Sequence, residues 1–452
     1  MHNKVLALIF ALIITGYLQS SGSDSIKKLL DASWLFYNNG KLDSSLRYAS
    51  EALKLSEELN NDTFIGHSNV MLGNIFVKKG EYKSAIQYYT YAQNIFERIQ
   101  FKKALAKTYN NLGIAYEKIG AFASSIFFYH RAYRINQESG DTGALIINLL
   151  NIASSLADKG YSDIAIGFLN KILGLIDTAK NADILSKVIL NKGVAMQEKH
   201  LYDSALYFYR KSLDIASHNN DYLMTTLALL NIAISYEKMH LLDSAFKYIN
   251  KAIKTSKRID NIEIGALLAY HHARILKERH NCKASMEILN GNLSLPLLAR
   301  NFTLLAKYYL LICECLLKRS NLKAVSDTLE NIYKISAVIE DPYTLIETIR
   351  IKALIDSLRG DTHSYDSLMQ RYATMRDSIT YYQDSTIKSL FESEKSIKRD
   401  SVTAGPTPGS STNVSPPPSS FRPSSIFKYT LLVAILIALM LPLILWLKRK
   451  NK

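Results

Sequence analysis

The sequence predicts an all-α solenoid of about nine antiparallel helix pairs, followed by a single transmembrane helix. Three observations support this prediction. A forty-residue pattern recurs along most of the chain without an insertion. Only 9 prolines and 19 glycines interrupt the 452 residues, which is too few for an architecture of many short strands. Residues 429–447 carry no charged side chain and are long enough to cross a bilayer core as a helix.

Residues 1–22 form the first predicted element, a secretory signal peptide. Lys4 precedes an apolar run over residues 5–14, and small polar residues follow at 19–23, as a signal peptidase requires. The apolar run is short for a membrane span, so we expect it to be cleaved. A retained anchor is the alternative, since the run can be extended to Leu18.

The repeat occupies residues 24–360 and is marked by a small residue at every fortieth position. These residues are Ser33, Gly73, Gly113, Ala153, Gly193, Ala233, Ala273, Cys313 and Ala353. A turn residue follows seven positions after each of them, at Gly40, Gly80, Gly120, Gly160, His200, His240, His280, Ser320 and Gly360. Each unit is therefore predicted to be an antiparallel helix pair, in which the turn residue ends the first helix in a left-handed conformation.

The second helix of four units is expected to begin at an aspartate, namely Asp43, Asp163, Asp203 and Asp243. A carboxylate at this place would accept hydrogen bonds from the free backbone N–H groups of the first turn. A serine follows the aspartate in three of these units, so the pairs could also be modification sites. We favour the capping interpretation.

These motifs resemble the tetratricopeptide repeat. The signature Leu-Gly-x-x-aromatic occurs at Leu72–Phe76 and Leu112–Tyr116, and Ala-x-x-x-Tyr occurs at Ala85–Tyr89 and Ala205–Tyr209. The resemblance covers roughly residues 26–375. The chain lacks the proline that usually closes each repeat, and its unit has forty residues rather than about thirty-four, so it is similar to the long-helix subclass found in kinesin light chains. The resemblance implies a right-handed superhelix that binds peptides.

The repeat pattern ends before residues 361–400, which are predicted to form one helix that caps the solenoid or, alternatively, a dimerising coiled coil. Residues 401–425 hold six of the nine prolines among Ser and Thr and are predicted to be an extended stalk. The cationic residues 448–452 follow the predicted span 429–447 and mark its cytoplasmic side. We therefore expect a single-pass protein of the inner (cytoplasmic) membrane with an extracytoplasmic, periplasmic body.

The candidate ligand-binding residues lie on the first helix of each unit, two positions before the small residue. This position is asparagine in four consecutive units, at Asn111, Asn151, Asn191 and Asn231. Asparagine is unfavourable inside a helix, but its amide can pair with the donor and acceptor of any peptide backbone. One turn earlier stand Lys107 and Lys187, and one turn later Ile114, Val194 and Ile234. The stripe predicts a peptide groove; asparagines that bond to the neighbouring helix are the alternative.

The groove residues also resemble a known clamp. Lys107, Asn111, Asn151 and Lys187 are similar to four of the five residues with which tetratricopeptide clamps hold a C-terminal carboxylate. The fifth residue, usually an arginine, is Asn191 here. The resemblance implies a peptide or protein ligand that ends in a carboxylate.

The sequence contains no motif for catalysis or for a cofactor. It has no Gly-rich phosphate loop, no nucleophile elbow and no His-Glu-x-x-His helix, so we expect neither an enzyme nor a cofactor. His200, His240 and His280 recur too far apart to share a metal ion and are predicted to be turn residues. Seven of the 55 Lys and Arg residues and none of the 40 acidic residues lie outside residues 24–400, so the body holds 48 basic and 40 acidic residues and carries +8 of the net charge of +15. This charge is expected on a solvated helical surface rather than on a nucleic-acid interface.

The sequence thus predicts a membrane-anchored extracytoplasmic solenoid that binds a peptide or protein segment, as a scaffold or a sensor. Its order of parts resembles the sensory half of bacterial membrane-bound tetratricopeptide regulators, which continue into a cytoplasmic output domain. The alternative is a truncated or partner-dependent regulator whose output domain lies on another chain and is reached through a partner in the membrane.

Overall fold

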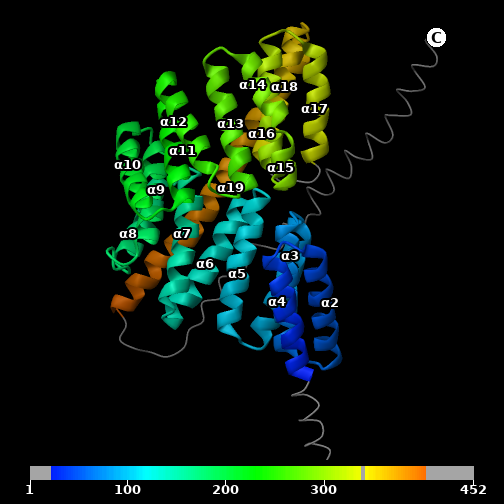
Figure 1. Cartoon of the computed structure of the whole chain (residues 1–452), viewed down its shortest axis with the longest axis vertical. Helices are drawn as coiled ribbons and strands as arrows, with labels where there is room; N and C mark the ends of the chain where they lie inside the picture. The colour runs from blue at the N-terminus through cyan, green and yellow to red at the C-terminus, as the bar shows by residue number, and fades with distance from the viewer. Residues whose placement is uncertain (1–21, 337–341, 404–452) are drawn as a thin grey trace, which may run out of the picture. The chain divides into compact units, whose positions relative to one another are not determined.

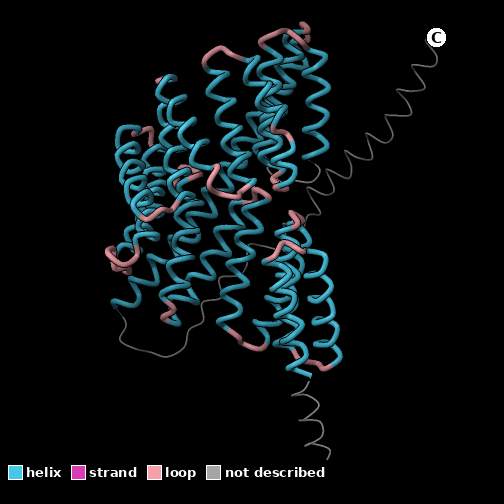
Figure 2. Tube along the Cα trace, viewed as in Figure 1, coloured by secondary structure: helices cyan, strands magenta, loops and turns pink. Residues whose placement is uncertain are grey.

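The computed structural model describes residues 22–336 and 342–403. This part of the chain is built from helices joined by short turns (Figures 1 and 2). None of the described helices is both long and apolar enough to cross a membrane. Nearly all of the predicted signal peptide at 1–22 and of the predicted stalk at 401–425 lies outside the described residues, as do the whole span at 429–447 and the tail at 448–452.

A helix over residues 22–38 comes first. The following helices are α2 (Leu42–Glu58), α3 (Asp62–Lys78), α4 (Tyr82–Arg98), α5 (Lys102–Lys118), α6 (Phe122–Ser139), α7 (Thr142–Ala157), α8 (Ser162–Leu173), α9 (Ala182–Glu198), α10 (Tyr202–His218), α11 (Tyr222–Lys238), α12 (Leu242–Ser256), α13 (Ile262–Glu278), α14 (Cys282–Gly291), α15 (Ser294–Leu298), α16 (Phe302–Leu317), α17 (Leu322–Ser336), α18 (Pro342–Leu358) and α19 (Thr362–Thr403). The described residues up to Glu392 belong to one compact unit, and every contact described below lies within it.

The helices alternate between two roles, as the forty-residue period predicts. From α3 to α17, each first helix packs against the second helix that follows it, for example α3 against α4, α5 against α6 and α11 against α12. First helices also contact the first helix of the next unit: α7 contacts α9, α9 contacts α11, α13 contacts α16, and α16 contacts α18. The first helices therefore form a continuous layer, which we call the inner layer, and the predicted solenoid of helix pairs is confirmed for the described units.

The turn inside each unit confirms the predicted left-handed residue at all nine positions. The backbone φ is positive at Gly40, Gly80, Gly120, Gly160, His200, His240, His280, Ser320 and Gly360. At His240, for example, φ is 58°, although a side chain disfavours this conformation. The three histidines thus occupy the turn position that glycine fills in the earlier units.

The small residue at every fortieth position lets the second helix approach closely. In three units it is glycine, and the ring of a tyrosine sixteen residues later lies directly over it, as Tyr129 lies over Gly113. Where the small residue carries a Cβ atom, the equivalent partner is aliphatic. Ala153 and Leu169 form such a pair in one apolar cluster, and Ala233 and Ile249 form one in another. The residue at the small position and its partner sixteen residues later thus vary together in size: glycine faces a tyrosine ring, and alanine faces a smaller aliphatic side chain.

The prediction that aspartates cap the second helices is wrong. Each of these helices begins one residue before the aspartate, and its cap residue, such as Lys41 in α2, makes no side-chain cap bond. The reason is that the left-handed turn residue starts the helix almost at once, so the aspartate falls inside the first turn. Three of the aspartates instead form an ion pair with a Lys or Arg that lies 36 residues later in the chain. Asp163, for example, pairs with Lys199 at 2.7 Å.

Asparagine and aspartate caps occur mainly on the first helices. Asn61, Asp141, Asp221, Asn261 and Asn301 each accept a hydrogen bond from the backbone N–H three residues later. These residues share the forty-residue register. The sequence therefore contained a periodic capping signal, but it belonged to the other helix of the unit.

Units far apart in the sequence also meet. Lys118, at the end of α5, forms an ion pair with Glu263 of α13 at 3.0 Å. The Asn301 side chain donates a hydrogen bond to the same carboxylate, also at 3.0 Å. Beside them, Arg300 pairs with Glu81 at 3.7 Å. The solenoid therefore coils so that its third unit touches its seventh, and its second unit touches the turn between its seventh and eighth.

Candidate functional site

The six predicted ligand-binding residues lie on consecutive helices of the inner layer. Lys107 and Asn111 are on α5, Asn151 is on α7, Lys187 and Asn191 are on α9, and Asn231 is on α11. All six side chains are exposed or half-buried. The structure thus brings the predicted set onto one layer, while its ligand-binding role stays a prediction.

Two of the asparagines join neighbouring inner helices. The Asn111 side chain donates a hydrogen bond to the Oδ1 atom of Asn74 at 3.1 Å, and Asn151 donates to Oδ1 of Asn110 at 2.9 Å. The Tyr89 hydroxyl donates to Asn74 as well. One N–H of each of these two amides is therefore engaged between helices, as the alternative interpretation expects. Their oxygens accept no hydrogen bond from the described residues.

A buried amide chain behind this layer was not anticipated from the sequence. Asn110 accepts hydrogen bonds from both Asn148, at 3.0 Å, and Asn151. Asn148 in turn accepts one from Asn136 of α6 at 2.6 Å. The chain connects α5, α6 and α7 through side chains that are largely shielded from water. A sequence signal existed, because Asn110 directly precedes the predicted asparagine in the same helix.

The other predicted residues have no such partners. Within the described part of the chain, Asn191 and Asn231 make no side-chain hydrogen bond, and Lys107 and Lys187 make no ion pair. Lys187 lies one turn before Asn191 on α9, and the half-buried Val194 lies one turn after it. This face of α9 therefore presents a cation, a free amide and an apolar side chain in sequence.

Carboxylates lie at the opposite ends of the same inner helices. Glu117 is the second-last residue of α5, Asp158 follows α7, and Glu198 ends α9. Asp158 has access to solvent, but the protein around it reduces its solvation, and this raises the pKa of its carboxyl to about 6; Glu117 and Glu198 add to the rise. Burial also raises the pKa of Glu117, although the Tyr129 hydroxyl, which donates to it at 2.7 Å, opposes that rise. A lysine directly follows each of these carboxylates, so these ends of the inner helices carry charges of both signs.

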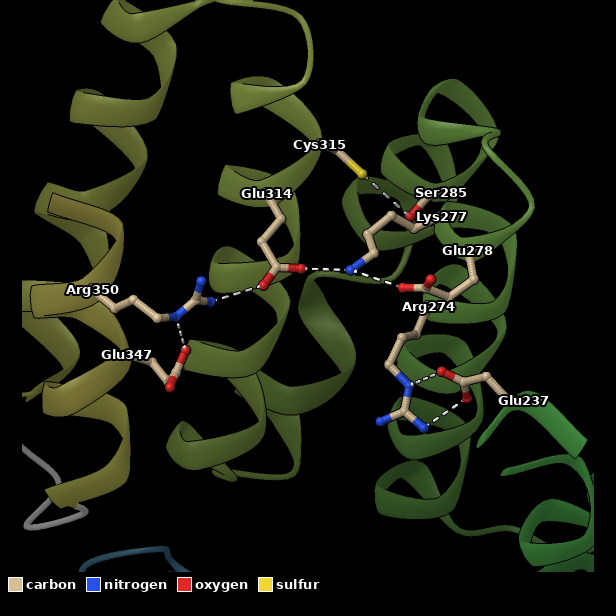
Figure 3. Close-up of polar contacts among 9 residues, drawn as sticks. All are labelled: Glu237, Arg274, Lys277, Glu278, Ser285, Glu314, Cys315, Glu347 and Arg350. Atoms are coloured by element: carbon tan, nitrogen blue, oxygen red, sulfur yellow. Dashed lines mark hydrogen bonds and ion pairs between the residues drawn. The ribbon is translucent and has the colours of Figure 1, made fainter. Parts of the chain in front are cut away.

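In the later units, ion pairs connect the inner helices to one another (Figure 3). Glu237 of α11 pairs with Arg274 of α13 at 2.6 Å, and Lys277 of α13 pairs with Glu314 of α16 at 2.7 Å. Glu314 also pairs with Arg350 of α18 at 3.2 Å. Burial alone would lower the pKa of Arg274, but the Glu237 carboxylate overcomes it and raises that pKa. These charges neutralise one another, unlike the free lysines of the earlier units.

Comparison with known proteins supports the repeat assignment. Residues 64–138 match the family model of the tetratricopeptide repeat. No curated protein sequence matches the chain. The fold is similar to that of a Rap protein complexed with competence and sporulation factor, with a TM-score of 0.53 and 12% identity over 79% of this chain and 99% of that one. It is also similar to the apo form of the quorum sensor NprR from B. thuringiensis, with a TM-score of 0.51 and 17% identity over 74% and 96% of the two chains.

Proposed function

We propose that this chain, a protein of tetratricopeptide-type repeats, binds an extended peptide or protein segment across α5, α7, α9 and α11. The observation that carries the proposal is the pair of free amides, Asn191 and Asn231, beside the unpaired Lys187. An exposed amide offers both a donor and an acceptor, which matches a peptide backbone whatever its side chains. A Rap protein of similar fold holds competence and sporulation factor, so this fold can carry such a ligand.

Each group has a separate role in the proposed binding. Asn191 and Asn231 contact the ligand backbone as donor and acceptor, whereas Asn111 and Asn151 contribute mainly their oxygens, since one N–H of each amide is already engaged. Helices packed about 10 Å apart make the four positions a track of about 30 Å, which suits about nine extended residues. Lys107 and Lys187 favour a ligand carboxylate, including a C-terminal one.

The protein is proposed to work as an extracytoplasmic scaffold or sensor anchored in the inner membrane by one span. The predicted signal peptide at 1–22 and the predicted span at 429–447 support this location. The alternative is a truncated or partner-dependent regulator that acts through a membrane partner and an output domain on another chain.

Substitution of the free amides should weaken ligand binding without loosening the fold. We expect Asn191→Ala with Asn231→Ala to lower the affinity for peptides selected from a library by about 1–3 kcal/mol, since each amide contact contributes about 0.5–1.5 kcal/mol net. The melting temperature should stay unchanged. Lys187→Ala should lower the affinity only for ligands that carry a carboxylate, and this difference in affinity should vanish at high salt. Binding is measured by fluorescence polarisation on the detergent-solubilised full chain.

The engaged asparagines are the matched control for this experiment. Asn111→Ala with Asn151→Ala removes two bonds between inner helices and should lower the melting temperature. If Asn191→Ala with Asn231→Ala behaves in the same way and leaves affinity untouched, or if no library peptide binds, the inner layer is not the ligand site.

The proposed location has its own test. Protease added to intact spheroplasts should digest residues 24–425 and spare the membrane segment, because the cationic end of the chain faces the cytoplasm. A body that is protected until the membrane is broken would reverse the proposed orientation.

A further inference from the structure

One face of α19 is buried although most of the helix is not. Gln383, Ile387 and Leu390 are buried, with Ile387 only 3% exposed, and their spacing places them on one side of a helix. Between them lie exposed residues such as Ser385 and Ser389. This stretch of α19 is therefore an amphipathic segment docked against another part of the protein.

The docking surface belongs to the third, fourth and fifth units. Ile387 and Leu390 join the apolar cluster that contains Leu149 and Ile152 of α7. The Tyr161 hydroxyl, in the turn between α7 and α8, donates a hydrogen bond to Asp384 at 2.5 Å. In Figure 1, α19 is the orange helix that passes beside α7. The segment of α19 thus packs against α7, in the middle of the solenoid, although it follows α7 by about 230 residues in the sequence.

This surface overlaps the proposed peptide site. The half-buried side chains packed on the same cluster include Ile114 of α5, Leu150 of α7 and Val194 of α9. Ile114 and Val194 lie one turn after Asn111 and Asn191, and Leu150 directly precedes Asn151. An apolar ligand side chain that used these residues would compete with Ile387 and Leu390 for the same space.

The contact made by α19 is small. In its part with described side chains, residues 362–390, three residues are buried, whereas the 17-residue α5 buries eight. Tyr381, next to the docked segment, is 77% exposed. A helix attached through so few side chains can leave its surface while the repeats behind it remain packed.

We propose that residues 383–390 of α19 are an intrinsic occupant of the inner layer, which an external ligand must displace. This inference rests on the proposed function, because it makes α19 the competitor at that site. The intrinsic occupant is helical, with the apolar side chains of Ile387 and Leu390 docked and the Asp384 carboxylate one turn before Ile387. Ligand binding and release of α19 are then the same event.

The test uses the chain's own segment as the probe. A fluorescent peptide of residues 376–390 is titrated into the full chain in detergent. It should bind the variant Ile387→Asp with Leu390→Asp at least about tenfold more tightly than the unsubstituted chain, because the docked α19 leaves only a small fraction of that chain competent. The control, Ser385→Asp with Ser389→Asp, makes the same charge change on the exposed face and should behave like the unsubstituted chain.

A second variant protects the test against misfolding. Tyr161→Phe keeps the ring but removes the hydrogen bond to Asp384, so it should raise peptide binding in the same direction by a smaller factor. Equal binding of the peptide to all chains, or no binding to either undocked variant, overturns the proposal.

The library peptides separate this proposal from the proposed function. If the 376–390 peptide binds the undocked variants but no library peptide binds, α19 is an occupant of a surface that has no such ligand. If library peptides bind the unsubstituted chain and the variants with undocked α19 with equal affinity, the proposed peptide site is supported. The proposal that α19 competes for it is then wrong.

Discussion

Arg274→Met should destabilise the solenoid by about 3–5 kcal/mol, because it leaves a buried carboxylate without its cation. The Glu237 side chain is 7% exposed and that of Arg274 is 21% exposed, and the two lie 2.6 Å apart between α11 and α13. Methionine preserves most of the side-chain volume, so the loss reports the unpaired charge rather than a cavity. Thermal unfolding should also split into two steps, since in a repeat array each unit is stabilised mainly by its neighbours.

Two further variants test whether the loss of stability in Arg274→Met comes from the burial of the unpaired Glu237 carboxylate. Arg274→Met combined with Glu237→Leu removes both charges and should recover most of the stability, because an apolar pair can replace a buried ion pair at little cost. Arg98 and Asp62 form an equally short pair at 2.7 Å, but both side chains are largely exposed. Arg98→Met should therefore cost about 0–1 kcal/mol. A similar loss in Arg98→Met and Arg274→Met would contradict the explanation.

The elements that the sequence predicts correctly depend on residues close together in the chain. The turn at His240 follows from its place in the period, although histidine itself gives no such signal. The pairing of Gly113 with Tyr129 also lies within one unit and could have been read from the sequence. The wrong prediction of aspartate caps shows the limit of this local reasoning. A shift of one or two residues in the start of a helix changes the role of Asp43 from cap to ion-pair partner.

The candidate site was predicted less completely because its chemistry depends on neighbouring units. Asn111 and Asn191 occupy equivalent positions, yet Asn111 bonds to Asn74 of the preceding unit and Asn191 has no partner among the described residues. Glu237 and Arg274 look like ordinary surface charges in the sequence. The contact of Ile387 with the cluster of α7 spans about half of the 452-residue chain, and no local pattern could indicate it.

Gly113→Ala should have opposite effects in two backgrounds. Alanine normally stabilises the interior of a helix by about 0.5–1 kcal/mol relative to glycine. At Gly113, however, the added methyl would overlap the ring of Tyr129. That ring is buried and its hydroxyl is bonded to Glu117 at 2.7 Å, so it cannot move aside freely. We therefore expect a net loss of about 1–3 kcal/mol in the unsubstituted chain.

In the Tyr129→Leu background the same change should become favourable. Leucine reproduces the aliphatic partner that faces Ala153 in the next unit, so Gly113→Ala should then recover the ordinary helical gain of about 0.5–1 kcal/mol. Urea unfolding of the four chains, followed by circular dichroism, measures both values and their coupling. If Gly113→Ala stabilises both backgrounds, the Tyr129 ring moves aside for the methyl group at little cost. The match in size between residues 113 and 129 then does not determine how closely α5 and α6 pack.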